Sequence, residues 1–292
     1  MENISCLISE MQQFGLIVNY SNINTSGKLQ RVATQAKPKS KNGWYVIHIN
    51  DFGVIAIYGD YQKDYKPIKW TNLTKITPEQ SQNLKNKMNQ TKIEDFIKKK
   101  ELLNQINLFY ANKVRPMEQL HKYLELKKLN TFMFKELSDP LGLTNDKKLV
   151  IPIRNINNEL MGLQTIDING KKLIVKGSQK KGNFYAISYN NINIKNAEMI
   201  FIGEGLSTMA SIHIAAHKIN QNIRICSIVA IDVYNIEAVL SNILPHNTKA
   251  KIILVADNDC SSEINIGVKT CTSIHNKYKN KINLNVYIPR AI

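Results

Sequence analysis

The last hundred residues alternate between short apolar runs and longer amphipathic stretches, and this alternation restricts the possible folds more than any other feature of the sequence. Apolar runs of strand length cover residues 199–202, 226–231, 251–256 and 282–288. Helix-like stretches cover residues 206–219, 236–243 and 264–278. Continuous apolar strands separated by amphipathic helices predict a parallel sheet with helices on both faces.

The sequence before this region divides into three further segments. Residues 1–75 contain two strand-like runs joined by a predicted hairpin turn, and form a small β-rich N-terminal unit. Residues 76–145 are predicted to be a helical connector, with Thr77 and Pro78 at a helix start. Residues 146–196 return to strands, with an Asn-Gly hairpin turn, and residues 197–292 form the parallel-sheet domain. The expected fold class is therefore α/β.

The composition indicates a folded, basic protein. Hydrophobic residues make up 43% of the 292 residues, which excludes a wholly disordered chain. Lys and Arg number 39 against 23 Asp and Glu, so the formal net charge is +16. Such a charge favours polyanions, of which nucleic acid is the commonest. The chain is also rich in Lys, Asn and Ile, and compositional drift explains the charge equally well.

The cysteines and the apolar runs exclude several classes of protein. Four cysteines are widely spaced and form no C-x-x-C pair, so neither a zinc ribbon nor a disulfide framework is predicted. No basic stretch precedes an apolar one at the start of the sequence, and no apolar run approaches the roughly 20 residues that span a bilayer. We therefore expect a protein of the reducing cytoplasm that makes no membrane contact.

Basic and aromatic residues gather in the N-terminal unit and leave two interpretations. The basic residues that precede the hairpin are Lys28, Arg31, Lys37, Lys39 and Lys41. The aromatic residues within and after it are Trp44, Tyr45, Tyr58, Tyr61, Tyr65 and Trp70. Such a set on a sheet can hold single-stranded nucleic acid by stacking and phosphate contacts. Burial in a small β core is the simpler interpretation, because period-2 strands bury one face in any case.

A lysine-dense loop with two glycines covers residues 176–182. Glycine allows the backbone to approach a phosphate closely, and lysine supplies the charge. An ordinary exposed basic hairpin explains the same residues equally well.

Acidic side chains follow two of the predicted parallel strands. Glu204 follows the run 199–202, and Asp257 and Asp259 follow the run 251–256. Ligands of open parallel sheets bind at the carboxyl ends of the strands, so we expect these acids to converge there around Mg²⁺. Taken singly, Glu204 also suits a helix N-terminus and the Asp pair suits a turn.

Three neighbouring features have simpler expected roles. Gly205 is expected to let the chain turn tightly from strand to helix. Backbone N–H groups near Ser207 and Thr208 can hold a phosphate at the start of the helix. Asn235, after the second strand, either joins the site or caps a helix, and capping is the simpler expectation.

The acidic motifs resemble the TOPRIM domain shared by bacterial-type primases, type IA and type II topoisomerases and some nucleases. The resemblance rests on Glu204-Gly205 and Asp257-x-Asp259, each after a strand, and Asn265-x-Gly267 resembles the plasmid and phage primase branch. Upstream stretches are similar to conjugative-plasmid and phage primases: residues 149–153, 162–164, 170–172 and 182–185, Tyr123-Leu124, and the N-terminal Arg31 and Gly43-Trp44-Tyr45.

The resemblance implies roles for individual residues. Asp257 and Asp259 would hold Mg²⁺, with Mn²⁺ as an alternative, and Glu204 would be a further metal ligand or the general acid/base. The residues implied in nucleotide or nucleic-acid binding are Lys171, Lys172, Lys176 and Arg154. The zinc ribbon of replicative primases is missing from the sequence, so no zinc is expected.

The implied activity is that of a nucleotidyltransferase. Residues 146–196 would be a primase-like subdomain ahead of a TOPRIM domain at 197–292. The enzyme would be a primase-like, DNA-dependent RNA polymerase that joins ribonucleoside triphosphates on a single-stranded DNA template during plasmid or phage replication. A helicase or another replication protein is an expected partner. The alternatives are a Mg²⁺-dependent TOPRIM nuclease and a non-catalytic nucleic-acid-binding module.

Overall fold

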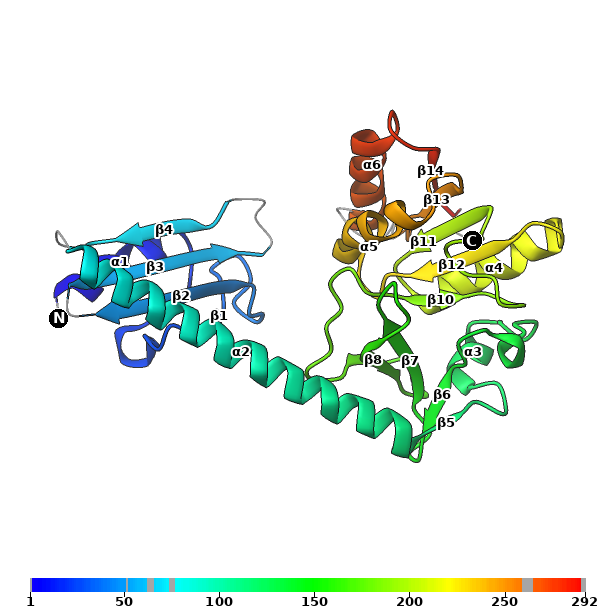
Figure 1. Cartoon of the computed structure of the whole chain (residues 1–292), viewed down its shortest axis with the longest axis horizontal. Helices are drawn as coiled ribbons and strands as arrows, with labels where there is room; N and C mark the ends of the chain where they lie inside the picture. Colours follow the sequence, from blue (N-terminus) through cyan, green and yellow to red (C-terminus); the bar gives the residue numbers. More distant parts are fainter. Residues whose placement is uncertain (1, 51, 62–65, 74–76, 259–264, 290–292) are drawn as a thin grey trace. The chain divides into compact units, whose positions relative to one another are not determined.

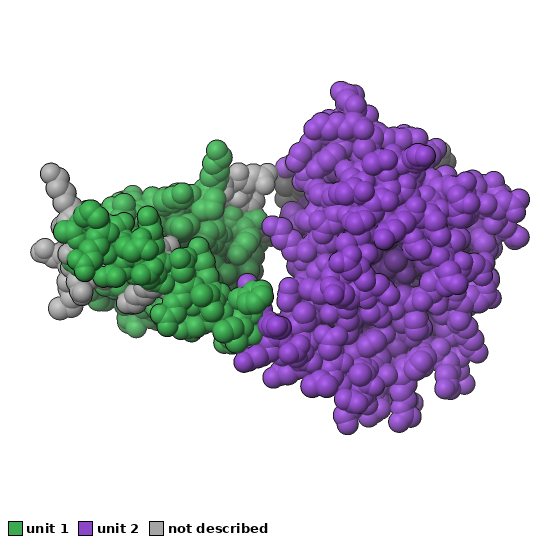
Figure 2. Space-filling view, in the orientation of Figure 1, with its two compact units in different colours: residues 1–98 green, residues 99–292 purple. Residues whose placement is uncertain are grey.

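The computed structural model describes residues 2–50, 52–61, 66–73, 77–258 and 265–289 (Figure 1). Contacts group the chain into two compact units, Met1–Lys98 and Lys99–Ile292 (Figure 2). The boundary between the two units lies inside the expected connector, residues 76–145, and each unit is described separately below.

The first unit is an antiparallel sheet with a helix on one face. The helices and strands are α1 (Glu2–Gln13), the 3-10 turn η1 (Tyr20–Asn22), β1 (Gln30–Val32), β2 (Gly43–Asn50), β3 (Gly53–Asp60) and β4 (Ile68–Thr71), and the strands lie in chain order. The predicted hairpin is confirmed, since β2 and β3 pair from Gly43↔Asp60 to Asn50↔Gly53. Apolar side chains of α1, including Leu7 and Met11, pack with one face of β2 and β3.

A long helix, α2 (Pro78–Lys113), follows. It begins at Pro78 as predicted, because proline tolerates the first helical position, where its missing N–H would have no partner. In the second unit, Ile106 of α2 is buried against Val150, Leu160 and Leu163.

The second unit contains two sheets. The first is antiparallel, in the order β5 (Val114–Pro116), β6 (Gly142–Thr144), β7 (Leu149–Arg154), β8 (Leu160–Ile166) and β9 (Lys172–Ile174). Between β5 and β6 lie α3 (Lys122–Leu126) and the 3-10 turn η2 (Phe134–Glu136). The expected connector is thus not only helical, because it supplies β5 and β6. The predicted hairpin at Gly170 joins β8 and β9, and Gly170 has a φ of +84°.

The second sheet carries the predicted strand–helix alternation. Its order is β10 (Tyr185–Ile187), β12 (Ile225–Val229), β11 (Met199–Gly203), β13 (Lys251–Val255) and β14 (Leu284–Tyr287). Helices α4 (Leu206–Ile219), α5 (Ile236–Ile243) and α6 (Ile266–Tyr278), with 3-10 turns η3 (Val233–Asn235) and η4 (Leu244–His246), connect the parallel strands. The four strands predicted within residues 197–292 pair parallel, and one strand from the preceding segment, β10, adds an antiparallel edge next to β12.

Both faces of this sheet are covered, as predicted. Ile200 and Ile202 of β11 pack with side chains of α5 and α6. Phe201, between them, faces the opposite side and packs with α4 and with residues of β7 and β8. Successive strand residues point to opposite faces, so a continuous apolar strand fills two cores. The unit is therefore a mixed α/β structure in which the two sheets share one core.

A titratable side chain lies inside this shared region. His213 of α4 is 1% exposed, and its Nδ1 lies 2.9 Å from the Ser227 hydroxyl. Burial, together with nearby His217, lowers the pKa of His213 to about 4 from its ordinary 6.5. The folded protein therefore holds this imidazole neutral at a pH where the unfolded chain would protonate it.

We expect the free energy of unfolding to fall as the pH drops from 6.5 towards 4. The unfolded chain then binds a proton that folded His213 does not, and the loss from this residue amounts to at most about 3 kcal/mol. Urea unfolding at several pH values measures it. His213→Gln keeps a hydrogen-bonding group and removes the titration, so its curve should be flatter. An unchanged slope in that variant contradicts the assignment.

Candidate functional site

Two acids that are 53 positions apart in the sequence come together at the carboxyl edge of the second sheet. Glu204 directly follows β11 and Asp257 closely follows β13, and these strands are parallel neighbours with Gly203 opposite Val255. Burial raises the pKa of Cys271 to about 11, and the carboxylates of Asp257 and Glu204 contribute to that rise. Both acids therefore act on the same buried thiol at this edge of the sheet. Their convergence around a metal ion stays a prediction.

A cavity of about 620 Å³ opens beside these strand ends. Its lining comes from three parts of the second unit, namely α3, the β8–β9 turn and the carboxyl edge of the sheet: Tyr123, Leu126, Lys127, Asn169, Gly170, Lys172, Gly205, Ser207, Thr208, Asp257, Asn258 and Pro289. The Tyr123 hydroxyl donates to the Ser207 hydroxyl at 3.3 Å, which ties α3 to the start of α4. The antiparallel sheet and the mixed sheet thus build one site.

One of the predicted lysines belongs to this cavity. The Nζ of Lys172 lies 3.5 Å from the position that a Cβ on Gly205 would occupy. Its ammonium therefore stands next to the turn that carries Glu204. Lys171 and Lys176 are also exposed, but they lie outside this lining.

The start of α4 faces the same cavity. Gly205 is the N-cap and, as a glycine, has no side chain with which to cap the helix. Ser207 and Thr208, in the first turn, line the cavity. First-turn N–H groups have no partner within the helix and carry the positive end of its dipole, so this end suits a phosphate.

The glycine that the strand–helix turn needs is not the predicted one. Only two residues separate β11 from α4, but Gly205 has a φ of −108°, which any residue adopts, so this turn does not require glycine at that position. At Gly203, by contrast, an added Cβ would stand 2.4 Å from the Met209 Sδ and 3.1 Å from the Val255 carbonyl oxygen. Gly203 is therefore required by the close packing of β11, β13 and α4.

A second glycine positions Asp257. A Cβ on Gly267 would stand 2.4 Å from the Asp257 carbonyl oxygen, so the first turn of α6 lies directly on the backbone of Asp257. Asn265 caps this helix by accepting from the Val268 N–H at 3.1 Å, and its Nδ2 donates to Asn258 at 2.9 Å. The Asn265-x-Gly267 motif thus holds the segment that carries the acid.

One further acid at this edge, Asp232, was not predicted from the sequence. Asp232 follows β12, the other parallel neighbour of β11, and its carboxylate pairs with the Lys180 ammonium. The rule that located Glu204 and Asp257, an acid after an apolar strand, would also have located Asp232. This ion pair attaches the predicted basic loop to the carboxyl edge of the sheet.

Asn235 also holds the basic loop, which corrects its expected role as a cap. It occupies the N-cap position of α5, but its side chain makes no capping hydrogen bond. Instead its Oδ1 accepts from the Gly182 N–H at 2.7 Å, and its Nδ2 donates to the carbonyls of Lys180, Asn183 and Ala230 at 2.8–3.0 Å. A buried amide with every donor and acceptor satisfied fixes the loop against β12.

The turn after β12 holds the backbone of Glu204 in place. Ile231 has a φ of +71°, which is strained for a β-branched residue. In this conformation its N–H donates to the Glu204 carbonyl at 3.0 Å. Strained residues of this kind persist where the surroundings over-determine them.

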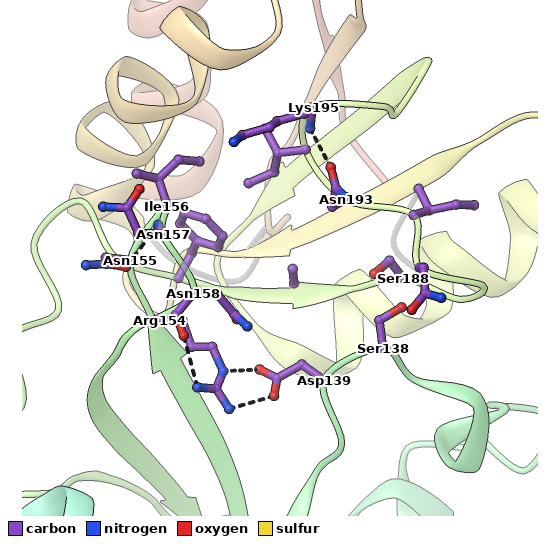
Figure 3. A pocket seen from close by; sticks show the side chains of 15 residues that line it. Ser138, Asp139, Arg154, Asn155, Ile156, Asn157, Asn158, Ser188, Asn193 and Lys195 are labelled. Atoms are coloured by element: carbon purple, nitrogen blue, oxygen red, sulfur yellow. Dashed lines mark hydrogen bonds and ion pairs between the residues drawn. The ribbon is translucent and has the colours of Figure 1, made fainter.

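Arg154 lies at a different cavity, of about 550 Å³ (Figure 3). Its Nε and Nη2 donate to both oxygens of Asp139 at 2.7 and 2.8 Å, and its Nη1 donates to the Asn158 carbonyl at 3.2 Å. The guanidinium is therefore engaged within the protein. Contact of Arg154 with nucleic acid stays a prediction.

The expected third acid of the site, Asp259, lies outside the described residues. Within the described part of the chain, no three His, Cys, Asp or Glu side chains are grouped closely enough to hold a metal. Glu204 and Asp257 themselves suit Mg²⁺, because both supply carboxylate oxygens and Asp257 lines an open cavity.

No protein-family model matches the chain. The chain is similar in structure to the primase fragment of the bacteriophage T7 primase-helicase protein, at 12% identity and a TM-score of 0.35, over 52% of this chain and 55% of that one. It is also similar to a chain in a structure of the bacteriophage T7 lagging-strand DNA polymerase with primase domains bound to an RNA/DNA hybrid and dTTP. That match has 11% identity and a TM-score of 0.36, over 52% of this chain and 69% of that one. The chain thus spans little more than half the length of the T7 primase fragment.

Among the described residues, no helix has the length and apolar character of a membrane span.

Gly203→Ala should destabilise the protein by about 1–3 kcal/mol, because the new methyl group must displace Met209 or separate β11 from β13. The matched control is Gly205→Ala, where the methyl group meets its nearest neighbour at 3.5 Å, so only the weaker N-cap preference of alanine, less than about 1 kcal/mol, should lower the stability. Denaturant unfolding of both variants measures the difference. Equal losses would show that the close packing at Gly203 is not what the strand requires.

Proposed function

We propose that the second unit is the catalytic part of a primase-like, DNA-dependent RNA polymerase of the TOPRIM type. It would make short primers on a single-stranded DNA template in plasmid or phage replication. The observation that supports this most is the convergence of Glu204 and Asp257 at adjacent strand ends, beside a cavity that also holds Lys172. A helicase or another replication protein is the partner we expect.

The metal proposed for this site is Mg²⁺, with Mn²⁺ as an alternative. Glu204 and Asp257 would hold it together with Asp259. When bound, the ion would supply positive charge to offset the negative charge that develops during phosphoryl transfer.

The chain's own residues have separate tasks in the proposed reaction. A 3′-hydroxyl attacks the α-phosphate of a ribonucleoside triphosphate, and pyrophosphate leaves. Lys172 neutralises phosphate charge, and the first-turn N–H groups of α4 near Ser207 and Thr208 orient the phosphates. A cavity of about 620 Å³ is within the usual range for small-molecule sites, which suits a nucleotide.

Asp257→Asn should reduce Mg²⁺-dependent primer synthesis by at least about a hundredfold, because the amide keeps the shape of the side chain and loses the charge that binds the ion. Incorporation of labelled ribonucleotides on several single-stranded DNA templates measures the effect. The control is Asp146→Asn, since Asp146 is an exposed acid that pairs with Lys148 outside the site.

Equal synthesis by the wild type and Asp257→Asn refutes the assignment of the acid. A second assay distinguishes a polymerase from a nuclease. Nicking of a supercoiled plasmid with Mg²⁺ and without nucleotides, abolished by the same substitution, would replace the proposed polymerase with a TOPRIM nuclease. Calorimetry that detects no Mg²⁺ or Mn²⁺ binding, with or without nucleotide, would support a non-catalytic module.

A further inference from the structure

The first unit divides its aromatic residues between two faces of one sheet. Tyr45 and Tyr58 are 3% and 2% exposed and belong to the core beneath α1. Trp44, the neighbour of Tyr45 on β2, points to the opposite face, where its register partners are Arg31 on β1 and Gly59 on β3. Burial in a core therefore explains only some of these rings.

On the second face Arg31, Tyr61 and Trp44 form a cluster, in which the guanidinium lies over Tyr61 and the two rings are tilted against each other. The Cζ of Arg31 lies 4.3 Å from the centroid of the Tyr61 ring, and the rings of Trp44 and Tyr61 are 5.9 Å apart. Tyr61 is nevertheless 55% exposed. An aromatic ring with a cation on one side and solvent on the other is preorganised to stack on a further flat group.

Two backbone features hold this cluster in place. A Cβ on Gly59 would stand 3.0 Å from the Trp44 indole, so the glycine leaves room for the indole to lie against β3. The Nε of Arg31 donates to the Lys41 carbonyl at 2.8 Å, which orients the guanidinium over Tyr61. The arrangement thus has little side-chain freedom left to lose on binding, which favours affinity.

Positively charged residues lie next to this cluster. The β1–β2 loop follows the register pair Val32↔Gly43, which is adjacent to the pair Arg31↔Trp44. The loop carries Lys37, Lys39 and Lys41, all of which are exposed. This loop, residues 33–42, contains no Asp or Glu. The exposed ring of Tyr61 and the half-buried ring of Trp44, next to a loop that carries three exposed lysines, match a strand of unstacked bases joined by phosphates.

We propose that Trp44, Tyr61, Arg31 and the lysines of the β1–β2 loop form a binding surface for single-stranded nucleic acid. Bases stack on Tyr61 and Trp44, while Arg31 and the lysines contact phosphates. The surface lies wholly in the first unit and shares no residue with the cavity at Asp257, so it does not depend on the proposed polymerase activity. Duplex DNA is excluded as the preferred ligand, because its bases are already stacked on one another.

The sequence contains two tryptophans, which allows a direct optical test. Trp70 lies against the core and its indole donates to Glu10 at 2.9 Å, so Trp70→Phe in the full-length chain leaves Trp44 as the single reporter. Titration with an oligo(dT) of about 12 nucleotides should quench Trp44 fluorescence, since bases stack on it. Oligo(rU) and duplex arms show whether DNA, RNA or both bind.

Tyr61→Ala, in an otherwise unchanged chain, should weaken binding of labelled oligo(dT) by about 5- to 150-fold, the loss typical of one stacked base. Tyr20→Ala is the control, because Tyr20 is 49% exposed in the same unit and should change affinity less than about twofold. Replacing Lys37, Lys39 and Lys41 by Gln should reduce the salt dependence of log Kd by about two units.

Two results would overturn the proposal. One is an oligonucleotide that binds the Trp70→Phe protein without changing Trp44 fluorescence. The other is Tyr61→Ala binding as tightly as the unchanged chain, in which case the lysines attract nucleic acid by charge alone. Circular dichroism of each variant shows that the sheet is intact, and loss of primer synthesis through Asp257→Asn does not affect either result.

Discussion

The parallel pairing of β11 with β13 is the constraint on which the candidate site depends. It places Gly203 opposite Val255, so the residues that follow the two strands emerge side by side. That pairing is only as close as Gly203 allows, because a larger residue there would meet the carbonyl of Val255. The acids therefore converge as a consequence of backbone packing, before any ligand is considered.

Several local interactions and close contacts fix the conformation of this edge of the sheet. Gly267 brings α6 onto the backbone of Asp257, while the strained turn at Ile231 holds the carbonyl of Glu204. Lys180 and Asn235 fix the basic loop to the end of β12. All of these interactions except the Lys180–Asp232 ion pair involve backbone groups, so hydrogen bonds and close contacts fix the positions of the functional side chains.

The sequence was sufficient for the parts of the fold that depend on local pattern. Alternating apolar and amphipathic stretches identified β11–β14 and their helices, and the strand-end rule placed Glu204 next to Asp257. It could not reveal β10, because a three-residue edge strand pairs with a segment 40 residues further along the chain. The packing roles of Gly203 and Asn235, and the division between Tyr45 and Trp44, also depend on neighbours that only the folded chain brings together.

The antiparallel strand β10 has a consequence for how the second unit can be divided. The segment before residue 197 supplies this edge strand and also covers the face that carries Phe201. A fragment cut at that point would leave β12 with an unpaired edge and one apolar face open to water, two conditions that promote association between chains. The region that resembles a catalytic module in sequence is therefore only part of the second compact unit, which begins at Lys99.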